Sequence, residues 1–135
     1  WNAHRQSLAH TYMTLLGPIA DEFGIVLPAP AHTNEPTGHS WNMYCVLLPF
    51  EKPWQAQLTR KQFIAALHAQ GIGIGISYEA MHLTSLFRGK GHREGEHPMA
   101  ERIAQQTVTL PLHAAMTETE VARVVKSLIS FLAKA

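Results

Sequence analysis

The sequence has little cysteine, little charge and no long apolar run, and each shortage argues against a class of protein. Cys45 is the single cysteine among 135 residues, so no internal disulfide can form and a reducing compartment is expected. Charged residues make up 16% and the net charge is +1, which favours neither a nucleic-acid nor an anionic-membrane partner. No apolar run approaches the roughly 20 residues that span a bilayer. We expect a cytoplasmic protein without membrane insertion.

The residues that are present fit one globular domain. The hydrophobic fraction is 46%, and the length allows a real core. The chain opens at Trp1, without an initiator Met and directly into an expected helix. We therefore expect a piece of a longer protein.

Nine histidines are many for this length, but the sequence does not gather them into a metal site. His92 and His97 lie five apart in a polar loop, whereas a helical zinc pair needs spacing i, i+4 and a third ligand. Solvated surface histidines are the favoured interpretation, and no metal is predicted. A serine hydrolase elbow of the form G-x-S-x-G is absent too.

Apolar spacing and capping residues predict the helices. The first covers Asn2 to Leu16, with Leu8, Tyr12 and Leu15 or Leu16 on one face, and Gly17-Pro18 ends or interrupts it. Capping boxes at Thr59 and Thr117 begin two more, of which the first ends before Gly71. The remaining predicted helical segments are a short one at 80–87 and one at 98–106 that begins with Pro98.

Three strands are expected, at Trp41–Phe50, at Ile72–Tyr78 and in the segment TVTLPLH, where Pro111 ends it. Strands and helices are interspersed, which predicts an α+β fold: a short, mainly antiparallel three-stranded sheet with helices packed on one face. Residues 1–23 would be a linking helical segment, 24–40 an extended connection and 41–135 the α+β core.

The stretch QGIGIGISYEAMH, from Gln70 to His82, is the first candidate for a binding site. A phosphate loop needs glycines between a strand and the start of a helix. Here the glycines follow a capped helix and enter a strand, which argues against that function. Gly73 and Gly75 would lie on one face of the strand, where absent side chains let a ligand or another backbone come close.

Tyr78 and His82 fall where this glycine-rich strand gives way to a short helix. Both side chains can hydrogen-bond a polar ligand while presenting an apolar face. The competing interpretation is that Tyr78 covers the core and His82 lies on a helix surface. His39, which precedes the strand together with Trp41, is a similar and weaker candidate.

The order of these motifs resembles the C-terminal segment of the DegT/StrS-type nucleotide-sugar aminotransferases. The matching pieces are HSWNMYCVLL, TRKQFIAALHAQGIGIGISYEAMH and HPMAERIAQQTVTLPLHAAMTETEVARVV. Within the family, HSW and YEAMH most resemble the branch that aminates UDP-4-keto-arabinose for the cationic modification of lipid A.

The resemblance implies a type I aminotransferase fold, in which a large domain holds pyridoxal phosphate and a small C-terminal domain closes over it in a homodimer. The implied reaction transfers an amino group, usually from glutamate, to a nucleotide-linked keto sugar. The cofactor lysine would lie upstream of Trp1, since no lysine of this chain has its sequence context. This chain would then hold no catalytic and no cofactor-binding residue and would be inactive alone, with Tyr78, His82 and His39 as substrate contacts.

Two departures from the family pattern accompany this resemblance. Ser77 stands where members often carry His before the aromatic residue, and Asn42 stands where many carry His within the strand. Two alternatives stay open: a non-catalytic domain of the same fold that senses a sugar nucleotide or a partner, and a stand-alone interaction module.

Overall fold

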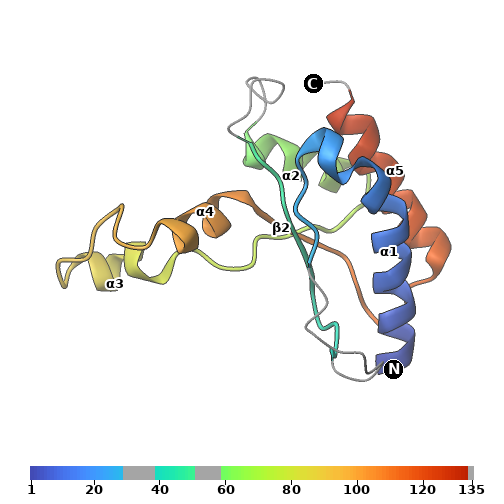
Figure 1. The fold of residues 1–135 in the computed structure, drawn as a ribbon, viewed down its shortest axis with the longest axis horizontal. Coiled ribbons are helices and arrows are strands. Elements are labelled where there is room, and N and C mark those ends of the chain that lie inside the picture. Colours follow the sequence, from blue (N-terminus) through green and yellow to red (C-terminus); the bar gives the residue numbers. More distant parts are fainter. Residues whose placement is uncertain (29–38, 51–58, 134–135) are drawn as a thin grey trace.

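The computed structural model describes residues 1–28, 39–50 and 59–133. Two long helices, α1 (Asn2–Phe23) and α5 (Glu118–Leu132), lie side by side along one flank of the molecule (Figure 1). The buried face of α5, beside which Ile129 is partly buried, consists of Val121, Val124, Val125, Leu128 and Leu132. On α1 the buried face includes Leu8, Tyr12 and Leu16, while Leu15 is left on the surface.

The first helix is longer than predicted. Gly17-Pro18 neither ends nor interrupts it, and α1 continues to Phe23. Pro18 removes one backbone hydrogen bond, but Ile19 and Phe23 pack against the core beyond it, so tertiary packing outweighs the loss. The helix ends at Gly24, whose φ of 64° is a left-handed C-cap conformation.

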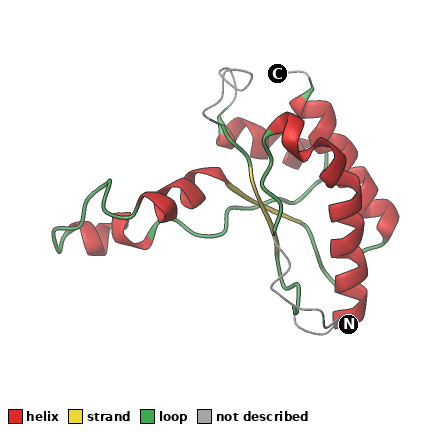
Figure 2. Cartoon of the chain, in the orientation of Figure 1, coloured by secondary structure: helices red, strands yellow, loops and turns green. Residues whose placement is uncertain are grey.

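The sheet has two strands, β1 (Tyr44–Leu47) and β2 (Thr107–Leu110), paired antiparallel with Tyr44 opposite Leu110 (Figure 2). The prediction of three strands is therefore wrong. The segment expected as the third strand, Ile72–Tyr78, touches the sheet through a single bridge, in which Gly75 and Thr109 exchange backbone hydrogen bonds of 3.1 and 2.8 Å.

Local chemistry explains why this bridge does not grow into a strand. Continuing its antiparallel register would place Gly73 opposite Pro111, which has no N–H to donate, and the Pro111 carbonyl already accepts from Tyr12 Oη at 2.8 Å. On the opposite side of this segment from β2, the backbone N–H and C=O of Ile74 contact the ring Nε2 of His68, at 3.3 and 2.7 Å. The segment therefore lacks free backbone partners opposite Gly73, where the next pair of hydrogen bonds to β2 would form.

Both predicted capping boxes are confirmed. Thr59 begins α2 (Arg60–Ala69) and Thr117 begins α5, each exchanging hydrogen bonds with the residue three positions on. Gly71 follows α2 at φ 72°, as expected for a helix stop. These helices and the sheet enclose one apolar core around Tyr12, Tyr44 and Phe63.

Residues 76–106 form a separate feature that we call the arm, and the other described residues form the body. The arm projects away from the body (Figure 1) and contains η2 (Met81–Leu83), α3 (Ser85–Arg88) and α4 (Pro98–Gln106). The short helix predicted at 80–87 is therefore divided in two, while the helix at 98–106 and the loop that holds His92 before it are as predicted. Within the described ranges, no residue of the apolar core lies in the arm.

Candidate functional site

Tyr78 stands where the body joins the arm. It is 78% exposed and has a φ of 71°, the left-handed region that a bulky side chain adopts at a cost of about 1–3 kcal/mol. Immediately before it, the Ser77 hydroxyl contacts the Thr109 hydroxyl of β2. The backbone thus turns sharply at an anchored position and presents the phenol to solvent.

His82 lies inside the arm. It is 7% exposed, and its Nε2 lies 2.8 Å from Oε1 of Glu101, so Nε2 carries the hydrogen that it donates to the carboxylate. The His97 ring meets it edge to face, with ring centroids 4.8 Å apart. A position on a helix surface, the alternative considered for His82, is therefore wrong. Contact of His82 with a substrate stays a prediction.

Glu101 is a residue that sequence reasoning missed. Its Oε1 also accepts the backbone N–H groups of Gly95, at 2.8 Å, and His97, at 3.3 Å. The hydrogen bond from His82 is the main reason that the pKa of the Glu101 carboxyl lies below its ordinary value, and the backbone donors act in the same direction. A carboxylate in the first turn after Pro98 was visible in the sequence, but no spacing relates it to His82.

A cavity of about 280 Å³ adjoins this pair. Its lining is mostly apolar and aromatic and includes three imidazole rings. The lining residues are Met81, His82, Phe87, His92, His97 and Ala100. His92 is itself bonded through Nδ1 to Glu96 Oε2 at 2.9 Å, on the exposed side of the loop. Within the described ranges, no three histidine, cysteine or acidic side chains are placed to hold a metal ion.

His39 lies in the body, at the entrance to β1. Its Nδ1 accepts the Trp41 N–H at 2.9 Å, and the two rings lie 4.2 Å apart. With Nδ1 as the acceptor, a neutral ring carries its hydrogen on Nε2, which leaves an exposed donor. The structure does not connect His39 to His82 through any contact that it describes.

The two positions that depart from the family pattern are polar and lie near the sheet. Asn42 is exposed beside β1. Ser77 is tied to Thr109 and lies 3.6 Å from Met43 Sδ. A serine here secures the backbone ahead of Tyr78 against the sheet.

The comparison with known families decides the identity of the chain. Residues 1–129 match the model of the DegT/DnrJ/EryC1/StrS aminotransferase family. The chain belongs to this family. The resemblance in the order of the sequence motifs is thereby confirmed at the level of the family.

Two solved structures share the fold of the chain. DesV of S. venezuelae, solved in complex with a ketimine intermediate, is 26% identical, with a TM-score of 0.78 over 98% of this chain and 32% of its own. The aminotransferase TlmJ from Streptoalloteichus hindustanus is also 26% identical, with a TM-score of 0.76 and the same coverage. Uncharacterized protein MJ1066 of Methanocaldococcus jannaschii is 29% identical over 90 residues, which are 66% of this chain and 22% of that protein.

The chain thus spans about a third of these solved structures. Enzymes of the DegT/DnrJ/EryC1/StrS family depend on pyridoxal phosphate, which is held by a lysine and by a partner of its pyridine nitrogen. The described residues of this chain do not fit that group. The single aspartate of the sequence, Asp21, is exposed on α1 and so offers no buried partner for a pyridine nitrogen.

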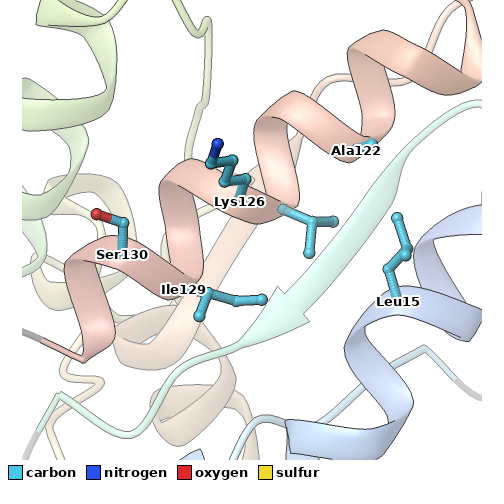
Figure 3. A pocket seen from close by; sticks show the side chains of 6 residues that line it. Leu15, Ala122, Lys126, Ile129 and Ser130 are labelled. Carbon is cyan, nitrogen blue, oxygen red and sulfur yellow. The ribbon is translucent and has the colours of Figure 1, made fainter.

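Lys126 shows the mismatch most clearly. It borders an apolar groove of about 380 Å³ between α1 and α5, together with Leu15 and Ile129, and its ammonium points away from Leu15 (Figure 3). Among the residues that the structure describes, no carboxylate lines this groove.

Within the described ranges, none of the helices combines the length and the apolar composition that crossing a bilayer needs.

Proposed function

We propose that this chain is the substrate-side, C-terminal domain of a pyridoxal-phosphate-dependent aminotransferase. The enzyme would transfer an amino group from glutamate to a nucleotide-linked 4-keto sugar. The observation that carries the proposal is Tyr78, an exposed aromatic residue held at positive φ where the arm leaves the body, in a chain of this family. Strain of this kind is typical of functional sites.

Two sequence motifs support a proposal for the branch of the family to which the enzyme belongs. HSW at residues 39–41 and YEAMH at residues 78–82 favour the branch of the family that aminates UDP-4-keto-arabinose for lipid A modification. A cytoplasmic homodimer belongs to the proposal. The cofactor lysine would lie in another part of the protein, and this chain alone would be inactive.

The residues of this chain act by binding and orientation. Tyr78 offers a phenol that both donates and accepts a hydrogen bond, above an aromatic face on which a sugar ring can pack. His39, in the body, offers its Nε2 hydrogen, since its Nδ1 accepts the Trp41 N–H. The Nε2 of His82 is committed to Glu101, so a contact with substrate would use its Nδ1, which accepts when the ring is neutral.

The test compares Tyr78→Phe, His39→Ala and His82→Ala with Leu86→Ala, an exposed control in the same arm. In the full polypeptide that carries this chain, loss of one substrate hydrogen bond should lower kcat/KM for the keto sugar by about threefold to tenfold. Leu86→Ala should leave it unchanged. Unchanged kinetics in all three site variants would remove the site assignment. Binding of a UDP-sugar without any amino transfer would instead favour the sensor alternative.

A further inference from the structure

The arm has a polar centre where the body has an apolar one. Glu101 is 7% exposed, although it carries a carboxylate, and it joins three separate parts of the arm. These parts are η2 through His82, the loop through the Gly95 amide and the beginning of α4 through the His97 amide. A buried carboxylate with three donors is a strong, directional centre.

We infer that Glu101 is a positioning residue, which holds the arm in the conformation that presents Tyr78 to the substrate. The inference rests on the proposed function of Tyr78. It concerns a residue that does not itself reach the substrate. Its effect would pass through His82, four positions after Tyr78.

The backbone around Tyr78 is fixed on both sides. Upstream, the Gly75 bridge and the Ser77 hydroxyl tie the chain to Thr109 of β2. Downstream, the His82 ring is held by Glu101. A left-handed φ at a tyrosine persists only where the surrounding structure determines it, and these two anchors supply that determination.

Glu101 also acts at the beginning of α4. His97 is the N-cap residue of α4 and makes no side-chain capping bond. The Glu101 carboxylate accepts the backbone N–H of His97 itself, and a negative charge near a helix N-terminus is favourable. Loss of the carboxylate would therefore free η2, the loop and the start of α4 together.

The charge of Glu101 gives a readout that a purely steric role would lack. The groups that face it are the His82 ring and the amides of Gly95 and His97, with the His97 ring behind His82. The pKa of the Glu101 carboxyl is lowered in the folded arm, so the contribution of its charge to the stability of the arm is complete above the ordinary glutamate pKa. That contribution is lost as the pH falls through the lowered value.

The experiment uses Glu101→Ala, Glu101→Gln and the matched control Glu96→Gln. Glu96 also pairs with a histidine, His92, at 2.9 Å, but the side chains of that pair are 42% and 34% exposed, against 8% and 9% for His82 and Glu101. We expect the exchange protection of the Gly95 and His97 amides to fall at least tenfold in Glu101→Ala and less in Glu101→Gln. Acid should remove this protection in the unsubstituted chain but have little further effect in Glu101→Gln. Glu96→Gln should behave as the unsubstituted chain.

A kinetic measurement tests whether Glu101 acts through Tyr78. In the full polypeptide, Glu101→Ala should lower kcat/KM about as much as Tyr78→Phe, and the double variant should be no worse than the more affected single variant. Unchanged protection of Gly95 and His97 in Glu101→Ala would overturn the inference, as would additive kinetic effects. If Glu101→Ala fails to fold, Glu101→Gln decides both measurements. Lost protection together with a silent Tyr78→Phe would refute the function proposed for Tyr78, and with it the positioning role.

Discussion

The body and the arm are stabilised by different kinds of interaction. In the body, two long helices and a short sheet bury side chains such as Leu16, Phe63 and Leu128 completely. The described arm holds no residue of that apolar core, and its interactions include the His82–Glu101 pair, Arg88 Nε donating to the Leu83 carbonyl at 2.7 Å, and ring contacts such as that of His82 with His97. Apolar packing is strong and non-directional, whereas hydrogen bonds fix orientation. The body therefore supplies stability, and the arm supplies a defined shape.

The largest expected effect is a difference in unfolding free energy between two leucine substitutions, one in the body and one in the arm. Leu128→Ala leaves a cavity in the body and should cost about 2–5 kcal/mol of unfolding free energy. Leu86→Ala in the arm removes a side chain that is 64% exposed and should stay within about 0.5 kcal/mol. Urea unfolding followed by circular dichroism measures both. A loss for Leu86→Ala as large as that for Leu128→Ala would show that the arm contains a core of its own.

The sequence predicted features set by nearby residues better than features set by distant ones, for a physical reason. Helix periodicity and capping boxes are local signals, and they identified α2, α4 and α5 correctly. The prediction of a third strand was wrong because the pairing of that segment depends on Pro111, a residue more than thirty positions away. The length of α1 was underestimated because packing of Phe23 compensates for Pro18.

The site shows the same division. Tyr78 and His82 were identified from the junction between strand and helix, and the structure places Tyr78 at the turn into the arm and His82 inside the arm. Their orientations were not predictable. The partner of His82 lies nineteen residues further on, and no periodic pattern relates the two. The positive φ of Tyr78 is likewise imposed by contacts on both sides of it.

Two glycines at positive φ test whether the regions unfold together. Gly71 in the body has φ 72° and Gly91 in the arm has φ 96°, and an added Cβ meets at most an ordinary contact at either site. Alanine therefore brings mainly backbone strain, about 1–2 kcal/mol. We expect Gly71→Ala to lower the stability of the body by this amount. Gly91→Ala should speed amide exchange in the arm and leave the unfolding midpoint of the body unchanged, because the arm can open first.

Equal shifts of the midpoint would contradict that comparison. They would mean that the arm and the body form one cooperative unit. The ordinary backbone of Gly73 provides the control, because an added Cβ there meets nothing within 4 Å. Gly73→Ala should leave both readouts nearly unaffected.

The smallest effect concerns the polar atoms inside the body. The Tyr12 hydroxyl donates to the Pro111 carbonyl, whereas the buried Tyr44 hydroxyl has no partner in the described part of the chain. Tyr12→Phe should therefore cost about 0.5–1.5 kcal/mol. Tyr44→Phe should be neutral or stabilise the body by up to about 1 kcal/mol, because it removes a desolvated hydroxyl that makes no hydrogen bond. A loss in Tyr44→Phe equal to that in Tyr12→Phe would show that the Tyr44 hydroxyl is bonded.

The same tyrosines give the body a pH response opposite to that of the arm. Burial raises the pKa of both phenols above the ordinary value, and for Tyr12 the neighbouring Tyr44 adds to the shift, with the rings 4.6 Å apart. A raised pKa means that stability is complete below the unfolded value of about 10 and falls as the pH rises beyond it. Tyr12→Phe and Tyr44→Phe should each reduce this alkaline slope, measured by urea unfolding between about pH 9 and 11. Acid should loosen the arm through Glu101, so titration in the two directions separates the regions without any substitution.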